Sequence, residues 1–517
     1  MRKTLFFILY PLCKSYFYIY EWPSDLDIVW PPPGAKLHSK SGYDHGFYGN
    51  NGAGDVLISE IGLFQTWQFS LYRNLISRLR VSKYRTKNPS NATAFIIPFD
   101  LGVNSYIDHV TGQPRLAAPL GRSAGWLLKN HCNGDQSDIF WKNRGHDHYI
   151  LFSITAYQMV GMMVKEFFMF VCQNCTVLTI ETSPTKTAIP GRTRKHWYAV
   201  PYPSSFHWHE RIIQLPWLNT NSRDVKPSSG QWEMLPRMNQ RYILSLFIGS
   251  TAPSQPSSKR LRVILQKQCT EDLTSSCHWY ETAHACNGVV NATKQMLLFR
   301  SAVFCPAPAG DSVTRKSIFD SLVAGCIPVL FSRASLSQYS WHVSDEDVDR
   351  VSVYIPMSGI LNGSLNFITV LKSITIDDIQ RKQKRIAELA PTLQYAVVPS
   401  DLDLNNSTWS PPFRDAADVV IDHILDRRTV EPITGFSNKE LLQQHQLQKY
   451  MLTNHEDYGA MRAVGEEGGG GGGGGRARKR KGGRKGSVGG GFGNSSASEA
   501  GEISKIRSLT RISTVCG

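Results

Sequence analysis

A short polar loop between two apolar runs carries the residue types of this sequence that are best suited to binding an anion. Its flexible, capping and basic members are Gly310, Asp311, Ser312, Thr314 and Arg315. Glycine lets the backbone approach a ligand closely, and Asp, Ser or Thr can cap a helix whose first amide groups attract phosphate. The guanidinium of Arg315 can hold a diphosphate through two bonds. We therefore predict an anion site here, with Asp320, in the helix that follows, as an acceptor for ribose hydroxyls.

Spacing alone leaves a second interpretation open for this loop. An ordinary strand, loop and helix with a polar cap has the same pattern, and the loop has neither the lysine of a P-loop nor a G-x-G-x-x-G run. The strands and helices predicted around the loop therefore help to decide between the two interpretations. Apolar runs predict strands at 242–248, 301–305, 327–331 and 351–355. Amphipathic runs predict helices at 260–268, 317–324 and 376–389. This alternation is typical of a nucleotide-binding α/β fold.

The first half of the chain alternates in the same way. Apolar runs predict strands at 16–20, 94–98, 148–152 and 177–180. Apolar residues at helical spacing predict one helix over 56–80. A stretch rich in Pro, Ser, Asn and Gly at 216–237 separates the two halves. We expect one α/β domain at 16–235 and a second, nucleotide-binding α/β domain at 236–430.

Length and charge agree with two domains and a tail. A chain of 517 residues with 41% hydrophobic residues can build two cores. Seven of the residues behind the net charge of +15 lie between Arg476 and Lys485, beside the glycine run at 468–475. Such a segment cannot bury enough apolar area to order itself. We predict a flexible, basic, low-complexity tail at 431–517; nucleic-acid binding by this tail is a minor alternative, and no specific nucleic acid is expected as a partner.

Several features favour the secretory pathway. Glycosylation triplets begin at Asn91, Asn174, Asn291, Asn362, Asn405, Asn406 and Asn494. Residues 1–15 hold two basic residues and an apolar run too short to span a bilayer, which suits a signal peptide or a short anchor. The ten cysteines include one close pair, Cys172 and Cys175, without a second pair or a His pair at zinc-ligand spacing, so no metal site is predicted.

Motifs along most of the chain resemble the exostosin-like glycosyltransferases, most closely the plant branch with xyloglucan galactosyltransferases. The run PAGDSVTRKSIFDSLVAGCIPV at 308–329 resembles the donor-site signature of that family. The other matching runs, in family order, are NPSNATAFIIPF at 88–99, WKNRGHDH at 141–148, VPYP at 200–203, QYSWH at 338–342 and YIP at 354–356. Together the matches span residues 16 to 425.

The resemblance implies a GT-B fold with two Rossmann-like domains facing a cleft, an acceptor-side domain at 16–235 and a nucleotide-sugar-binding domain at 236–430. The enzyme it implies is an inverting glycosyltransferase that uses a UDP-sugar. Its acceptor would be a polysaccharide or a glycoprotein glycan, and galactose is the first choice of sugar. It also implies residence in the Golgi lumen, with association with the membrane as a further expectation. No obligatory metal is implied; the three Asp-x-Asp-like triplets, at 25–27, 345–347 and 401–403, are interpreted as surface carboxylates and not as a GT-A metal site.

The resemblance also suggests roles for individual residues. The donor-binding set is Gly310, Asp311, Ser312, Thr314, Arg315 and Asp320. Arg315 would stabilise the leaving diphosphate, with Arg241 or Arg260 as helpers, and either Asp147 or Glu181 would be the base. The acceptor-side residues are Trp141, Arg144 and His148. The alternative of a different class is a catalytically inactive glycan-binding or scaffold protein with the same fold.

Overall fold

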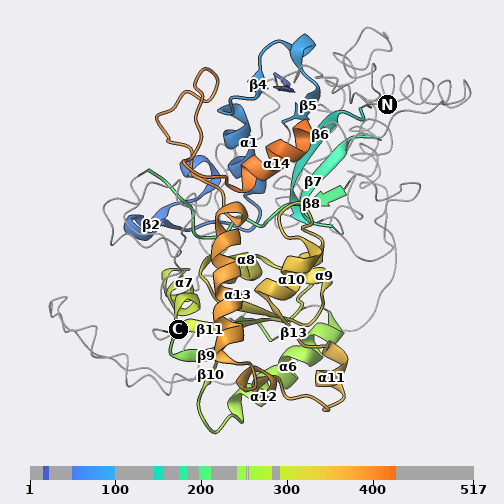
Figure 1. The fold of residues 1–517 in the computed structure, drawn as a ribbon, viewed down its shortest axis with the longest axis vertical. Helices are drawn as coiled ribbons and strands as arrows, with labels where there is room; N and C mark the ends of the chain where they lie inside the picture. The colour runs from blue at the N-terminus through green and yellow to red at the C-terminus, as the bar shows by residue number, and fades with distance from the viewer. Residues whose placement is uncertain are drawn as a thin grey trace, which may run out of the picture. The chain divides into compact units, whose positions relative to one another are not determined.

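The computed structural model describes residues 15–21, 49–98, 145–155, 174–182, 197–210, 241–251, 253, 255–281 and 292–426, all within one compact unit, Met1–Glu456. The expected leader, the boundary at 235, and the tail from 431 lie outside these residues. Two parallel sheets organise the described part of the chain (Figure 1). This arrangement confirms the α/β class expected from the alternating pattern.

The first sheet has the strand order β4-β1-β5-β6-β7-β8, and each neighbouring pair is parallel. Its strands are β1 (Phe17–Ile19), β4 (Arg85–Thr86), β5 (Ala94–Ile97), β6 (His148–Thr155), β7 (Thr176–Glu181) and β8 (Trp197–Ala199). Every residue of β5 and β7 is buried, as expected for inner strands of a parallel sheet that is covered on both faces.

The second sheet has the order β10-β9-β11-β12-β13 and is parallel throughout. Its strands are β9 (Ile243–Gly249), β10 (Cys277–Glu281), β11 (Ala302–Ala307), β12 (Ile327–Leu330) and β13 (Val353–Tyr354). The chain goes from β9 outward to β10 and then returns to the other side of β9 for β11. The strand order therefore reverses between β9 and β11, and ligands of open α/β sheets bind beyond the carboxyl ends of the strands at such a point.

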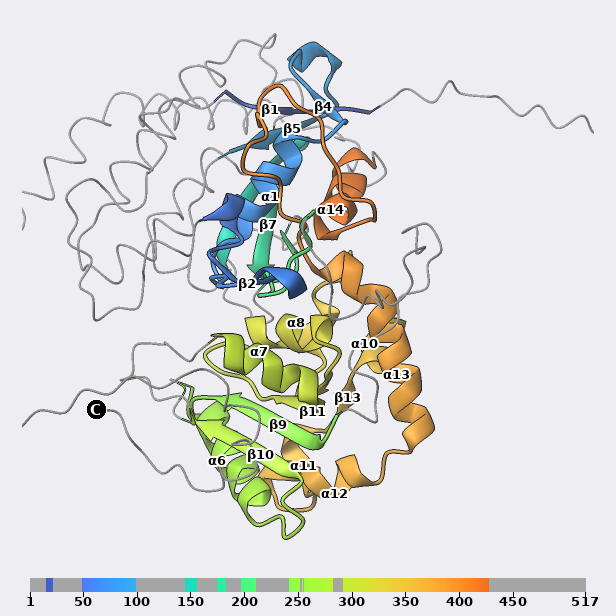
Figure 2. The same ribbon diagram turned by 90° about the vertical axis from the view of Figure 1, so that its left-hand side faces the viewer.

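Helices cover both faces of the second sheet. Figure 2 shows α7 and α8 on one side of it, and α6, α11 and α12 on the other. The helices of this layer are α6 (Pro256–Thr270), α7 (Ala292–Ser301), α8 (Lys316–Val323), α9 (Ala334–Ser337), α10 (Asp345–Val351), α11 (Met357–Leu361), α12 (Phe367–Lys372) and α13 (Ile376–Leu389). Helix α13 begins where the Thr375 side chain accepts a bond from the Asp378 amide, and its buried residues recur every three or four positions.

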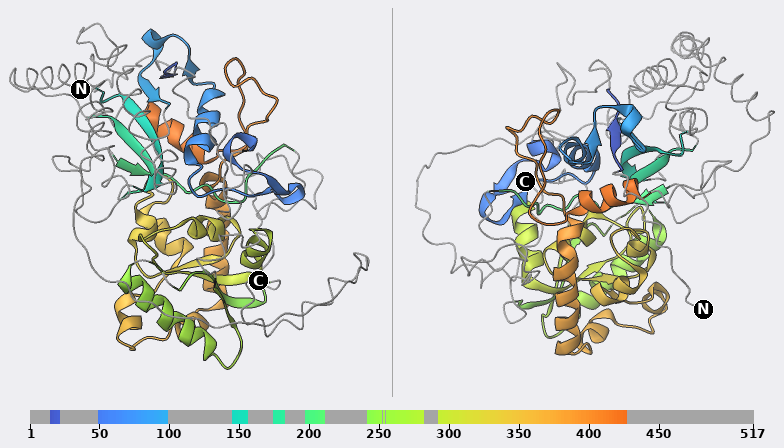
Figure 3. Two further views of the ribbon diagram at one scale, coloured as in Figure 1. Left: turned by 180° about the vertical axis from the view of Figure 1, so that it is seen from behind. Right: turned by 45° about the horizontal axis from the view of Figure 1, so that its top comes forward.

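The last described helix, α14 (Ala416–Leu425), returns to the first sheet. Figures 1 and 3 show it beside α1 (Leu71–Arg80). A buried ion pair of 2.9 Å joins Arg78 on α1 to Asp415, the residue that caps α14. The end of the range 236–430, predicted for the second domain, therefore contacts α1 of the first sheet's layer through this ion pair. The predicted domain bounds stay a prediction.

The predicted helix over 56–80 was half wrong. Strands β2 (Val56–Ile58) and β3 (Leu63–Phe64) form an antiparallel hairpin around a single 3-10 turn, η3 (Ser59–Ile61), and the only α-helix of this range is α1. Gly62 takes a φ of 63° at the turn, a conformation that breaks a helix and favours glycine. Helical spacing of apolar residues did not reveal this turn.

Two disulfides brace the second sheet, one between Cys269 and Cys277 and one between Cys305 and Cys326. The first fastens α6 to edge strand β10, and the second joins β11 to the start of β12. Disulfides persist in oxidising compartments. In the described ranges, no helix has the length and apolar character needed to cross a membrane.

Candidate functional site

The predicted anion loop, residues 308–315, begins where β11 ends, at the reversal of strand order. Arg262 on α6 holds it there. The guanidinium of Arg262 donates to the Ala309 carbonyl at 3.0 Å, to the Pro308 carbonyl at 3.3 Å, and to the Ser250 carbonyl just beyond β9. Arg262 thus ties together the two loops that follow β9 and β11, the two strands between which a ligand is expected.

Two guanidinium groups crowd the backbone of Gly310. A Cβ atom at this position would lie 2.1 Å from Nη2 of Arg315 and 3.3 Å from Nη2 of Arg262. Glycine therefore leaves room here for a close approach by two arginine side chains; the predicted close approach of a ligand stays a prediction. Any side chain here would displace Arg315.

These two arginines bring positive charge to the loop, beside the carboxylates of Asp311 and Glu181. Burial, and next the charge of Arg315, lower the pKa of Arg262 to about 9, although Asp311 acts in the opposite direction. Burial also lowers the pKa of Arg315. The Arg315 Nε atom is buried without a hydrogen-bond partner among the described residues. Adjacent buried cations with an unused donor suit a ligand of high negative charge, such as a diphosphate.

Glu181, the last residue of β7, brings the first sheet to this loop. Its side chain is 1% exposed, and Oε2 accepts bonds from Ser312 Oγ at 2.8 Å and from Tyr202 Oη at 3.3 Å. Burial raises its pKa to about 7, against the opposing effects of these two bonds, a Thr314 amide and the charge of Arg315. A carboxyl group with a pKa near neutrality can accept a proton during a reaction.

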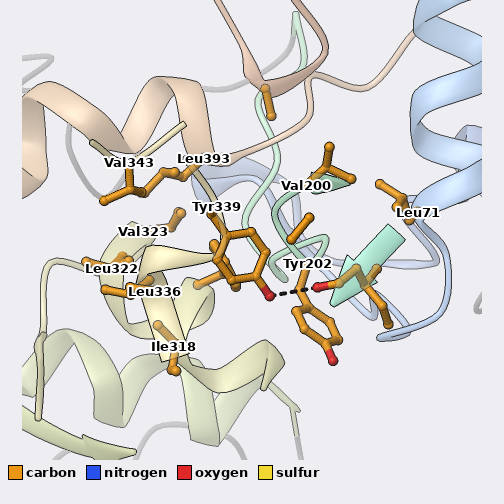
Figure 4. Close-up of a cluster of buried hydrophobic side chains, with 14 of the residues drawn as sticks. Leu71, Val200, Tyr202, Ile318, Leu322, Val323, Leu336, Tyr339, Val343 and Leu393 are labelled. Atoms are coloured by element: carbon orange, nitrogen blue, oxygen red, sulfur yellow. Dashed lines mark hydrogen bonds between the residues drawn. The ribbon is translucent and has the colours of Figure 1, made fainter. Parts of the chain in front are cut away.

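The QYSWH segment fixes the end of β7 and so the position of Glu181. The hydroxyl of Tyr339 donates to the Ile180 carbonyl at 2.7 Å, and the amide of Thr182 donates to Gln338 Oε1 at 2.8 Å. These bonds flank Glu181 on both sides along the chain. Figure 4 shows Tyr339 beside Tyr202 in the apolar cluster between the two sheets.

Asp320 joins the two sheets as well. Its Oδ1 accepts from the Ser205 amide at 2.8 Å, and Lys316 Nζ lies 2.8 and 2.9 Å from its two oxygens. The side chain is 3% exposed. Asp320 therefore holds α8 against the turn that follows β8. The sequence predicted that this carboxylate accepts bonds from ribose hydroxyls, but in this structure it is buried and bonded to Ser205 and Lys316.

Asp147, the other predicted base, lies at the opposite end of the first sheet's strands, at their amino ends. It precedes β6, whereas Glu181 ends the parallel neighbour β7, so the two are separated by roughly 20 Å at about 3.3 Å per residue. Asp147 Oδ1 lies 2.7 Å from His148 Nδ1, and His148 Nε2 lies 2.6 Å from the Tyr20 hydroxyl. The structure therefore brings Glu181, but neither Asp147 nor His148, to the anion loop. Trp141 and Arg144 lie outside the described residues.

Arg241 and Arg260 were predicted to assist Arg315, but the arginine that contacts the loop in the structure is Arg262. Arg241 donates to the carbonyls of Phe299, Ala302 and Ala324 and packs elements of the second sheet together. Arg260 is exposed. Sequence reasoning missed Arg262, although its place in the first half of the helix that follows Gly249 is the signal that could have identified it. Among the residues that the structure describes, there is no cluster of His, Cys, Asp and Glu that could hold a metal.

Comparisons with known proteins place these features in a family. A model of the Exostosin GT47 domain matches residues 14–374. A probable xyloglucan galactosyltransferase of Arabidopsis thaliana, GT19, is 28% identical over 384 residues, covering 69% of this chain and 78% of that protein. The xyloglucan galactosyltransferase MUR3 of the same plant is 27% identical over 387 residues, covering 72% of this chain and 55% of its own length.

Two further similarities differ in strength. A xyloglucan-specific galacturonosyltransferase of Arabidopsis thaliana is 28% identical over 405 residues, covering 74% of this chain and 52% of that protein. The chain thus spans between 52% and 78% of the length of these relatives. A crystal structure described as a UDP-N-acetylglucosamine 2-epimerase from Listeria monocytogenes has a TM-score of 0.24 and 7% identity, covering 63% of this chain and 86% of its own. That likeness is too weak to carry an argument.

Proposed function

Because the chain belongs to the exostosin GT47 family of glycosyltransferases, the family expected from its motifs, we propose that it transfers galactose from a UDP-sugar to a polysaccharide of the xyloglucan type. The choice of sugar and acceptor rests on the names of the relatives. One of them is named for galacturonic acid, so galacturonic acid is the second donor sugar to test.

The observation that carries this proposal is the contact of Glu181 with the anion loop. A transferase of this kind needs a proton acceptor for the attacking hydroxyl beside a positive site for the departing diphosphate. Ser312 donates to Glu181 at 2.8 Å, and the charge of Arg315 acts on the same carboxylate. The proposed base, from the first sheet, therefore contacts the cationic loop of the second sheet. This contact lies beyond the carboxyl end of β11, where the strand order reverses between β9 and β11.

The proposed reaction is one displacement with inversion at the anomeric carbon. The acceptor oxygen forms the new bond to that carbon as its proton passes to Glu181. The bond from the anomeric carbon to the diphosphate oxygen breaks, and the electron pair leaves with the nucleoside diphosphate. Arg315 and Arg262 stabilise this negative charge. Gly310, Asp311, Ser312 and Thr314 keep their proposed role in binding the donor; Asp147 is the alternative base.

We also propose that the protein acts in the lumen of the Golgi apparatus. The two disulfides of the second sheet suit an oxidising compartment, as the glycosylation triplets do. A polysaccharide acceptor and a nucleotide-sugar are its partners in this proposal.

A transfer assay tests the proposal. The purified chain is incubated with UDP-galactose and a xyloglucan oligosaccharide, and both UDP release and the mass of the acceptor are measured. We expect the acceptor to gain one hexose, and the Arg315→Ala variant to lose most of this activity. UDP-galacturonic acid serves as the second donor. Binding of the oligosaccharide without transfer from any UDP-sugar would instead identify an inactive glycan-binding protein.

A further inference from the structure

We propose that Asn362 carries an N-linked glycan, on a part of the second sheet's layer that the proposed transfer does not use. The triplet Asn362-Gly363-Ser364 follows helix α11, and all three residues are exposed. It has the sequence that the glycosylation machinery recognises, with glycine and not proline at the middle position. The inference rests on the proposed luminal location but not on the proposed chemistry.

The local geometry leaves the reacting atom available. Asn362 Oδ1 accepts a bond from the Ser364 amide at 3.0 Å, so the carboxamide oxygen is occupied within the turn. No hydrogen bond from Asn362 Nδ2 to another described residue is present. Gly363 has a φ of 78°, and a Cβ atom built there would meet nothing within 4 Å. The folded chain therefore has open space beside the triplet for a bulky, hydrophilic substituent.

Other triplets in the described ranges suit a glycan less well. After Asn174 come Cys175 and Thr176, which are 0% and 7% exposed and enter the buried strand β7. The Asn406 carboxamide is engaged at both ends, since Nδ2 donates to Asp403 at 2.6 Å and Oδ1 accepts from Lys87 at 2.7 Å. A glycan at Asn406 would remove the first of these bonds. Asn362 requires no such loss.

Two further triplets begin at exposed asparagines, Asn91 and Asn405, and serve as internal comparisons. Thr93, which completes the Asn91 triplet, is partly buried, whereas Ser364 is exposed. Both hydroxyls donate to a backbone carbonyl at 3.3 Å, so exposure is what distinguishes the two triplets. Ser407, which completes the Asn405 triplet, is also partly buried. The structure therefore singles out Asn362.

The modification needs one co-reactant, an oligosaccharide linked to a lipid through a diphosphate. The Asn362 Nδ2 atom forms a bond to the anomeric carbon of the oligosaccharide, and the bond from that carbon to the diphosphate oxygen breaks. The electron pair leaves with the lipid diphosphate, and the amide loses one proton. No oxidant or reductant takes part.

Peptide mapping tests this inference. The full chain is expressed in plant cells, purified, and treated with peptide N-glycosidase in heavy-oxygen water, so that a formerly glycosylated asparagine becomes a labelled aspartate. We expect the label at Asn362. Ser364→Ala should abolish it and Ser364→Thr should retain it, with transferase activity unchanged in both. A digest in heavy-oxygen water without the glycosidase is the control, because the Asn362-Gly363 pair can deamidate spontaneously and only label that depends on the enzyme reports a glycan. This result is independent of whether the chain transfers galactose.

Two results would overturn the inference. An unlabelled Asn362 in a chain labelled at Asn91 or Asn405 shows that the site was wrongly chosen. A chain without label at any triplet shows that it does not carry such glycans at all, and its cellular location then tests the luminal proposal separately.

Discussion

Ser312 Oγ donates a 2.8 Å hydrogen bond to Glu181 Oε2, and this bond joins the anion loop of the second sheet to the end of β7 in the first. Tyr202 donates to the same oxygen at 3.3 Å. Glu181 is therefore held where it can meet both the acceptor hydroxyl and the donor. The predictions below test this arrangement and the contacts that support it.

The pH dependence of transfer should report Glu181. Its pKa is raised to about 7, and a base must be ionised to accept a proton, so kcat should rise with pH through about 7. Stability should change in the other direction. Because the folded state binds this proton more tightly than the unfolded chain, the stabilisation is present below the ordinary pKa of 4.5 and is lost as pH rises through about 7.

Glu181→Gln should remove that pH dependence of stability, as measured by urea unfolding between pH 5 and about 8. The glutamine retains an acceptor for Ser312 but does not titrate. An unchanged pH profile in this variant would show that another group is responsible.

Arg262→Ala should weaken binding of UDP. The substitution removes a buried guanidinium whose bonds hold the loops after β9 and β11. Hydrogen bonds to charged groups contribute about 1.5 to 3 kcal/mol, which corresponds to a roughly 10- to 100-fold rise in Kd for UDP. Isothermal titration calorimetry measures this change. Arg260→Ala, an exposed arginine on the same helix, is the matched control and should bind like wild type; equal affinities for all three proteins would exclude Arg262.

Tyr339→Phe should lower kcat more than it changes KM for the donor. The variant loses the 2.7 Å bond to the Ile180 carbonyl, which positions the neighbouring Glu181. It also leaves a buried carbonyl without this donor, at a cost of about 1 to 3 kcal/mol in the free energy of unfolding. Tyr354→Phe, at an exposed tyrosine, is the control for both measurements. A variant with lower stability but normal kcat would limit Tyr339 to a structural role.

Arg78→Ala should destabilise the protein strongly. Arg78 is 1% exposed, and its pair with Asp415 anchors α14 on α1. Removing one partner of a buried ion pair costs about 3 to 5 kcal/mol, because the other charge is left uncompensated. Urea unfolding of Arg78→Ala, beside Arg80→Ala on the same helix, measures the difference. A loss below about 1 kcal/mol would mean that α14 does not depend on this pair.

Local signals account for what the sequence predicted well. Helix α13 has the predicted bounds, Ile376–Leu389, because a Thr cap, acidic residues in the first turn and regular apolar spacing all coincide. The loop between β11 and α8 lies where the sequence predicted it, because apolar runs mark the elements on both sides. The expected cap was wrong, since the N-cap of α8 is Arg315 and no side chain caps it. Anion binding by this loop stays a prediction.

Tertiary contacts account for what it missed. The partners of Arg262 and of Asp320 lie at Ser250, at Pro308 and at Ser205, and only the strand order brings these residues together. The same holds for Glu181 and Asp147. Asp147 precedes β6 and Glu181 ends β7. Because the two strands are parallel, the two carboxylates lie at opposite ends of the sheet's strands. Edge strand β10 escaped notice because its sequence, CHWYE, lacks an apolar run.

The most direct test of the central claim compares kcat and UDP affinity in Glu181→Gln and Asp147→Asn. General-base catalysis contributes about 10²- to 10⁴-fold, so Glu181→Gln should lose that much in kcat while its Kd for UDP stays within about a factor of three. Asp147→Asn should keep kcat within about tenfold of wild type in the folded fraction. A Glu181→Gln variant with wild-type kcat, or a larger loss of kcat in Asp147→Asn than in Glu181→Gln, would contradict the assignment of Glu181 as the base.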